Sequence, residues 1–261
     1  MSHVTANQPL TSLPFFSRSM DELVIELTTG GKLQTVATPN PEQIVLAYSN
    51  HEFTQILSQI DYLVPDGMGL VLASHLLAKQ NKMTSLPARI PGVELASVLI
   101  KRYLEFGQPI LIVGGRAYAG LYLAIAGRMV EILDVAAMKE VRPSQNQAVY
   151  WSPNFTDVTQ ILTELKPGLV LVALGAPHQE EWILRQKMIL ERSQVKVAMA
   201  VGGAIDILAG KIKRAPRWMR NLGLEWLWRL IQEPWRLKRQ LQLIKFVEIV
   251  FKELAIESKN S

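Results

Sequence analysis

The chain has 261 residues, 49% of them apolar and 20% charged, a composition that excludes bulk disorder and can fill a sizeable core. The absence of cysteine excludes disulfides, thiolate metal sites and cysteine nucleophiles. The four histidines show no zinc-site spacing, and the apolar runs are shorter than the roughly 18 residues of a membrane-spanning helix. The N-terminus has no signal-peptide pattern, so we expect a cytosolic protein.

The net charge of +5 is concentrated at one end of the chain. Residues 211–261 hold 12 basic and 5 acidic side chains, whereas the other 210 residues hold 16 basic and 18 acidic ones. Four of the six tryptophans, Trp218, Trp226, Trp228 and Trp235, lie in the same basic segment. This segment indicates an anionic partner, such as phosphate, nucleic acid or an anionic membrane surface.

Residues 1–20 have no clear periodicity and are interpreted as an N-terminal arm. From 21 to 210, short β-rich apolar runs alternate with longer helical stretches, which predicts a Rossmann-like α/β core with a mainly parallel sheet and flanking helices. The predicted strands are 33–37, 61–64, 110–113, 169–174 and 195–201, and the predicted helices are 41–50, 67–79, 92–106, 117–133 and 177–191. Residues 134–153 stay unassigned.

The alternation stops after Gly210. Residues 216–232 and 235–255 are predicted helices, and Pro234 between them suits the first turn of a new helix. We therefore divide the chain into the arm, an α/β catalytic core over 21–210, and a basic, Trp-rich helical appendage over 211–261.

Four loops follow predicted strands, at residues 38–41, 65–69, 175–179 and 202–206. Ligands of open α/β sheets bind beyond the carboxyl ends of the strands, so these loops are expected to share one rim. Gly67 lets the backbone approach a ligand at a helix N-terminus, while Gly202-Gly203 are also compatible with simple turn chemistry. No GxGxxG or P-loop motif is present, which removes the main support for dinucleotide or P-loop chemistry.

Asp66 is the carboxylate best placed for chemistry, because it lies between Pro65 and Gly67 at the end of a predicted strand. A carboxylate in that setting can accept a proton from a hydroxyl nucleophile. The alternative reading is that Asp66, like Thr38, only caps a helix N-terminus.

No Asp-x-Asp pair occurs, so no metal site is predicted, and a diphosphate at the rim would need arginines. Arg229, Arg236 and Arg239 are spaced by seven and three residues and would share a face on continuous helix. The alternative is a solvated or membrane-facing basic surface.

Several segments together resemble the WecG/TagA/CpsF family of glycosyltransferases. They are residues 38–40, 61–69, 89–95, 175–180 and 202–206, followed by the stretch from Lys213 to Arg236. The resemblance spans about residues 33–240, and its strength comes from many motifs in the same order.

The resemblance implies an inverting transfer of an N-acetylmannosamine-type sugar from a UDP donor to N-acetylglucosamine on undecaprenyl diphosphate. The product would serve a cell-surface polysaccharide such as teichoic acid. The UDP-sugar is a substrate, so neither a cofactor nor a metal is expected. The enzyme would work in the cytoplasm, peripherally on the anionic inner face of the cell membrane.

The resemblance also implies roles for particular residues. Asp66 falls on the catalytic base, with Thr38, Asn40 and Arg89 in the same pocket. Gln179 and Asp206 fall on motifs that line the donor site, together with the glycines at 67, 202 and 203. Arg229, Arg236 and Arg239 fall in a segment that closes over the site.

Two other classes stay open. A nucleic-acid-binding protein would use the basic Trp-rich segment over a broad stripe, with a steep salt dependence. A Rossmann-type redox or methyl-transfer enzyme would need a glycine-rich first turn followed by an acidic residue, which is absent. We favour the transferase and expect no nucleic-acid partner; a homo-oligomer and the identity of the donor sugar stay open.

Overall fold

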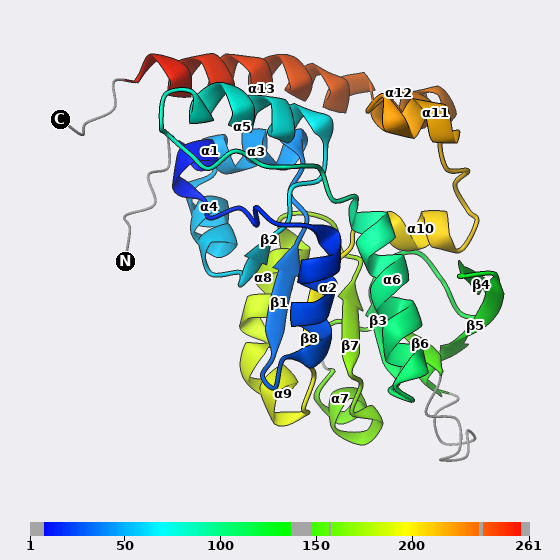
Figure 1. Ribbon diagram of the computed structural model, residues 1–261. Helices are drawn as coiled ribbons and strands as arrows, with labels where there is room; N and C mark the ends of the chain where they lie inside the picture. Colours follow the sequence, from blue (N-terminus) through cyan, green and yellow to red (C-terminus); the bar gives the residue numbers. More distant parts are fainter. Residues whose placement is uncertain (1–7, 137–147, 157, 235–236, 257–261) are drawn as a thin grey trace.

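The computed structural model describes residues 8–136, 148–156, 158–234 and 237–256. In these ranges one eight-stranded sheet has the order β2-β1-β8-β7-β3-β6-β5-β4 (Figure 1). Neighbouring strands run parallel, except that β4 pairs antiparallel with β5. The strands are β1 (Gln34–Ala37), β2 (Tyr62–Leu63), β3 (Ile110–Val113), β4 (Tyr122–Ile125), β5 (Arg128–Asp134), β6 (Val149–Ser152), β7 (Leu169–Val172) and β8 (Val197–Ala200). The predicted α/β fold with a mainly parallel sheet is confirmed.

Helices cover both faces of this sheet (Figure 1). They are α1 (Pro9–Ser12), α2 (Met20–Thr29), α3 (Pro41–Ser49), α4 (His51–Ser58), α5 (Met68–Ala78), α6 (Gly92–Glu105), α7 (Thr159–Leu165), α8 (His178–Arg185), α9 (Lys187–Arg192), α10 (Ala204–Leu208), α11 (Arg217–Asn221), α12 (Glu225–Gln232) and α13 (Leu237–Ala255).

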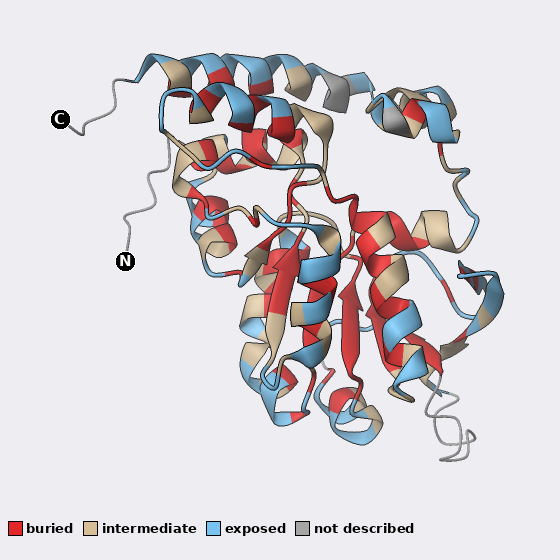
Figure 2. Cartoon of the chain, in the orientation of Figure 1, coloured by how far each residue is buried: buried red, intermediate tan, exposed pale blue. Residues whose placement is uncertain are grey.

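The central strands are buried on both faces, as their uninterrupted apolar sequences predict (Figure 2). In β3, Leu111 and Val113 join an apolar cluster with α3, α4 and α13, whereas Ile110 and Ile112 join a second cluster with α2 and α6. All four side chains are fully buried. The sheet is therefore a rigid base for the loops at its carboxyl edge.

The predicted helix over 117–133 is wrong. The structure forms the hairpin β4–β5 there, with Ile125 opposite Arg128 across a two-residue turn. Ala126 and Gly127 form this turn with φ angles of 49° and 80°, the left-handed conformation that tight hairpins require. Burial alternates along β4, which is the period of a strand.

Other predicted helices are shifted or divided. The helix predicted at 41–50 ends at Ser49, and the extended Asn50 then caps a second helix, α4, that was not predicted. The helix predicted at 177–191 is divided at Gln186 into α8 and α9. The helix predicted at 216–232 is divided at Gly223, which has a φ of 73°. In the unassigned region, β6 occupies 149–152, while 137–147 lie outside the described residues.

The helix α13 lies along α3 and α5 (Figure 1). One of its faces buries Phe246, Ile249 and Val250 in the apolar cluster that also holds α3. Near its end, the Glu253 carboxylate accepts the backbone N–H groups of Leu10 and Thr11 at 3.0 and 2.9 Å. Both ends of the described chain therefore pack onto the core, and the division into arm, core and appendage stays a prediction.

None of the described helices combines the length and the apolar composition that crossing a membrane requires.

Candidate active site

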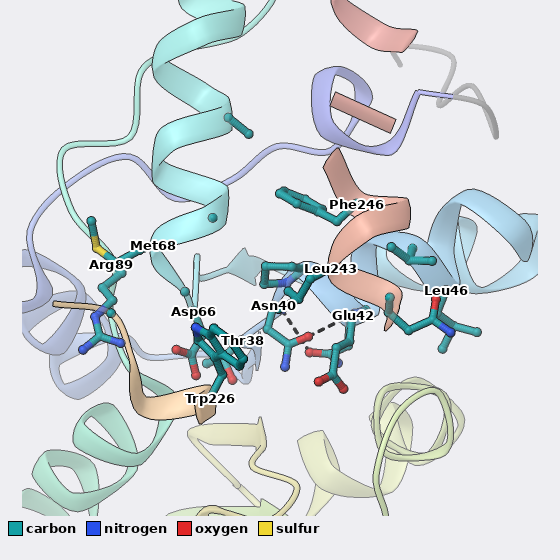
Figure 3. Close-up of a pocket in the computed structure, with 18 of the residues that line it drawn as sticks. Thr38, Asn40, Glu42, Leu46, Asp66, Met68, Arg89, Trp226, Leu243 and Phe246 are labelled. Atoms are coloured by element: carbon teal, nitrogen blue, oxygen red, sulfur yellow. Dashed lines mark hydrogen bonds between the residues drawn. The ribbon is translucent and has the colours of Figure 1, made fainter. Parts of the chain in front are cut away.

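A cleft of about 1310 Å³ lies at the carboxyl edge of the sheet. Four adjacent strands, in the order β2-β1-β8-β7, each send their following loop into its lining. These loops contribute Asp66, Thr38, Gly202 and Gln179, in the same order. The opposite side is lined by residues 222–226 between α11 and α12 and by α13, including Phe246 (Figure 3). The four loops that the sequence indicated therefore surround one cavity.

Asp66 is one of the residues that line the cleft (Figure 3), and backbone groups hold it in place. Its N–H donates to the Pro39 carbonyl at 3.0 Å, and its Oδ2 accepts the Gly92 N–H at 3.0 Å. Gly92 is the first residue of α6, so the carboxylate lies at a helix N-terminus, where negative charge is favoured. Asp66 is thus oriented by the fold, as a base that receives a proton must be.

Thr38 lies against the same helix end. A Cβ atom added to Gly92 would be 2.6 Å from Thr38 Oγ1 and 3.4 Å from Asp66 Oδ2. Only glycine lets the threonine, the carboxylate and α6 approach this closely. Neither Thr38 nor Asp66 caps the helix that follows it, because Asn40 caps α3, and Gly67, with a φ of 127°, begins α5.

Asn40 and Gln179 belong to one partly buried hydrogen-bond network. Gln179 accepts the Gly202 N–H through Oε1 at 2.9 Å and donates through Nε2 to Glu180 Oε1 at 2.8 Å. Gln43 donates to the same Glu180 oxygen at 3.1 Å, and its own Oε1 accepts the Asn40 N–H at 3.2 Å. Burial raises the pKa of Glu180 to about 7. The network joins the loops after β1, β7 and β8.

Arg89 lines the cleft but is also tied to the appendage. It donates to the Arg220 carbonyl and lies 3.8 Å from the Glu225 carboxylate. Arg214 reaches both Glu225 and Glu94, at 3.5 and 2.6 Å, and Arg220 reaches Glu94 at 3.2 Å. Three arginines and two glutamates thus join α6 to the segment around α11 and α12.

Beside these ion pairs lies a smaller cavity of about 370 Å³, lined by Arg89, Pro91, Glu94, Arg217 and Arg220. The sequence indicated a basic appendage but did not single out Arg217 or Arg220. The sequence signal that includes these two arginines is the excess of positive charge in the segment. Their closeness to Arg89 arises from tertiary packing, which the sequence does not show.

Gly203 lines the cleft, whereas Asp206 is not among the lining residues. Asp206 Oδ1 accepts the Tyr118 hydroxyl at 3.1 Å. Burial, with the Asp206 charge second, raises the pKa of Tyr118. The described contact of Asp206 is therefore with the protein, and its role at the donor site stays a prediction.

The three arginines predicted to close over the site lie largely outside the residues that the structure describes. Arg236 and the side chains of Arg229 and Arg239 lie outside the part of the chain that the structure describes, so their roles stay predictions. The turn between α11 and α12 does reach the cleft. A Cβ atom on Gly223 would be 2.6 Å from Met68 Cγ, so this turn rests directly on the start of α5.

Among the described residues, no group of three or more histidine, aspartate or glutamate side chains is arranged to hold a metal ion. The prediction that the reaction needs no metal is left to experiment.

Comparisons with known proteins show which family the chain resembles. The model of the glycosyl transferase WecG/TagA/CpsF family matches residues 9–260. A Bacillus subtilis (strain 168) protein named N-acetylglucosaminyldiphosphoundecaprenol N-acetyl-beta-D-mannosaminyltransferase is 30% identical over 250 residues, covering 95% of this chain and 88% of that protein. A Bacillus spizizenii protein of the same name is 28% identical over 259 residues, covering 97% and 93%. The chain therefore belongs to the WecG/TagA/CpsF family of glycosyltransferases.

Proposed function

We propose that the enzyme transfers an N-acetylmannosamine-type sugar from a UDP donor to N-acetylglucosamine on undecaprenyl diphosphate, with inversion at the anomeric carbon. The observation that carries this proposal is Asp66, held by the Gly92 N–H beside Thr38 in the cleft of a family member. The names of the two Bacillus relatives supply the sugar, the acceptor and the β linkage.

In this mechanism Asp66 accepts the proton of the acceptor hydroxyl while that oxygen attacks the anomeric carbon and UDP leaves from the opposite face. One base is sufficient for such a single displacement, and general-base assistance contributes about 10²–10⁴-fold.

The departing diphosphate needs positive charge, which contributes to catalysis as fixed electrostatic stabilisation. Arg89 lines the cleft, and the predicted partners Arg229, Arg236 and Arg239 would complete the set. Arginine pairs with phosphate oxygens through two parallel hydrogen bonds, so these side chains can serve where many transferases use a metal.

The direct test is incubation with a panel of UDP-sugars and a lipid-diphosphate N-acetylglucosamine acceptor, with UDP release as the readout and the linkage determined by NMR. We expect UDP-N-acetylmannosamine to give a β-linked product. Failure of every UDP-sugar would refute the donor class, and an α-linked product would refute inversion. The same assay with EDTA should retain activity; loss that Mn²⁺ or Mg²⁺ restores would refute metal independence.

The proposal includes peripheral binding to the cytoplasmic face of an anionic membrane. A large apolar surface, with side chains 44–64% exposed, spans α5 and the outer face of α13 (Figure 2). It consists of Leu72, Leu76, Leu237, Leu241, Ile244, Val247 and Phe251. Exposed Lys245 and Lys252 lie on the same helix. Apolar side chains bordered by lysines suit the interface of an anionic bilayer.

Part of this apolar surface also lines the cleft, through Leu72, Leu76, Val247 and Phe251. A lipid-linked acceptor could thus keep its chain in the bilayer while its sugar reaches Asp66. We expect the double variant Leu241→Gln with Ile244→Gln to bind anionic vesicles less tightly than wild type. Met188→Gln is the matched control, because Met188 is equally exposed on α9, at the other end of the molecule (Figure 1). Equal vesicle binding by all three proteins would refute this surface.

A further inference from the structure

Glu180 is a buried carboxyl group just behind the cleft lining. It is the third residue of α8, whose N-cap is Pro177. Its side chain is 0% exposed, and it is not among the residues that line the cleft. Its Oε1 accepts two amide N–H groups, whereas its Oε2 has no hydrogen-bond partner among the described residues. Burying a carboxyl group with one oxygen unsatisfied costs stability, so an apolar side chain would serve packing better.

The carboxyl group determines how two glutamine amides are turned. Because Glu180 Oε1 accepts from both, Gln43 and Gln179 must each direct Nε2 toward it. Their Oε1 atoms then face away, toward the backbone N–H groups of Asn40 and Gly202. If either glutamine amide were flipped, its NH₂ group would face the backbone N–H of Asn40 or Gly202. Both groups are donors, so no hydrogen bond could form between them. One oxygen thus sets the orientation of both glutamines.

We propose that Glu180 is a positioning residue for the glycosyltransferase site, which acts through Gln43 and Gln179 to hold the Asn40 and Gly202 loops in place. The inference rests on the proposed function and deepens it. The two loops follow β1 and β8, neighbouring strands whose carboxyl ends border the cleft. Glu180 itself touches no substrate in this scheme.

The neighbouring Glu181 provides a matched control. It is the same residue type on the same helix, but its carboxylate pairs with Arg185 and lies 3.9 Å from His178 Nδ1, outside the network. The groups that face Glu180 from α3 and from its own helix are the uncharged amides of Gln43 and Gln179. An effect that depends on the network should therefore appear when Glu180 is substituted and not when Glu181 is substituted.

The kinetic test compares Glu180→Leu, Glu180→Gln and Glu181→Gln. Misplacement of catalytic groups by about 1 Å can cost about 10²-fold, so we expect Glu180→Leu to lower kcat by about 10–10²-fold with a smaller change in KM. Glu180→Gln keeps an accepting oxygen and should recover most of kcat, and Glu181→Gln should match wild type. Wild-type kinetics for Glu180→Leu, or equal losses in Glu180→Leu and Glu180→Gln, would overturn the inference.

Backbone amide hydrogen exchange gives a readout that does not depend on activity. We expect Glu180→Leu to speed exchange at the Asn40 and Gly202 amides about tenfold relative to wild type, which is about 1.4 kcal/mol, with the β3 amides unchanged. Glu180→Asp keeps the carboxyl group, but its shorter side chain does not reach both glutamines. It should show the same faster exchange at Asn40 and Gly202, and it replaces Glu180→Leu in this test if that variant does not fold.

Two failures can be told apart. If wild type transfers no sugar but exchange changes at Asn40 and Gly202 alone, the proposed function fails while Glu180 still positions the loops. If wild type transfers sugar and exchange at these amides stays unchanged in Glu180→Asp and Glu180→Leu, the positioning role is refuted.

Discussion

The two walls of the cleft are built in different ways. The rim wall, formed by the loops that carry Thr38, Asn40, Asp66, Gln179 and Gly202, is fixed by hydrogen bonds to backbone groups and by a buried carboxyl group. The appendage turn, residues 214–232, is fixed to Arg89 and α6 by ion pairs whose side chains are 16–37% exposed and by the hydrogen bond from Arg89 to the Arg220 carbonyl. Ion pairs at a protein surface contribute about 0–1 kcal/mol each, and we expect these partly buried pairs to lie near the upper end of that range.

We therefore expect the rim wall to be the more rigid of the two, and the appendage turn to move more readily without unfolding the protein. The buried face of α13, with Phe246 and Val250, anchors the end of the appendage in the core. Motion is therefore expected at α11 and α12 rather than at α13. Substitutions in the rim wall should lower kcat strongly, and those in the ion pairs weakly.

The largest effect is expected at the rim wall from Asp66→Asn. The amide keeps the shape and can accept the Gly92 N–H, but it cannot take a hydroxyl proton, so kcat should fall by about 10²–10⁴-fold. Calorimetry should show unchanged UDP-sugar binding, and thermal unfolding should show an intact fold. Near-wild-type turnover would remove Asp66 from the role of base.

Gly92→Ala tests the same wall without changing a functional group. The added methyl would lie 2.6 Å from Thr38 Oγ1, so Thr38 or α6 must shift, and kcat should fall by up to about 10²-fold. Gly31→Ala is the control, because a Cβ at Gly31 has no atom within 4 Å. Equal kcat for both variants would show that the close approach at Gly92 does not matter.

The buried Glu180 predicts a pH dependence of stability. Burial raises its folded-state pKa from 4.5 to about 7, so the folded state binds this proton more tightly than the unfolded state. Stability should therefore fall as pH rises from 4.5 to 7, by up to ~3 kcal/mol for this group. Urea unfolding at pH 5 and pH 8 should show this loss in wild type but not in Glu180→Gln. Parallel pH profiles for the two proteins would contradict the assignment.

The smallest effect is expected at the appendage turn. Glu225→Gln weakens the ion pairs with Arg89 and Arg214, at a cost of about 1 kcal/mol, so kcat should fall only about fivefold. The loss should shrink at high salt, because salt already screens the wild-type pairs. Glu22→Gln, which weakens an exposed surface pair with Arg18, is the control. A loss as large as that of Gly92→Ala would mean that both walls are equally fixed.

The sequence predicted the central strands and the position of Asp66 at the end of a strand because these signals are local. Ile110–Val113 and Leu169–Val172 are apolar throughout, and Pro65-Asp66-Gly67 comes one residue after β2 ends at Leu63. The prediction of a helix at 117–133 was wrong because the apolar residues there fit both the helical period and the strand period. The turn at Ala126-Gly127 makes the segment a hairpin.

Contacts between residues that are far apart in the sequence could not be predicted from it. Glu180 is bonded to Gln43, a residue 137 positions earlier, and its burial has no signature in its own helix. Arg89 likewise gains its partners from an appendage more than 130 positions away. Such groups are recognised only when packing has brought them together.

The contact between Glu253 and the first helix has a consequence for synthesis. Its hydrogen bond to Leu10 joins positions 243 residues apart, so α1 cannot make this contact during synthesis until α13 has left the ribosome. Until then the apolar surfaces that α13 will cover on α3 and α5 stay open to water. A chain truncated before α13 would therefore expose these apolar surfaces of α3 and α5, which favours aggregation and proteolysis.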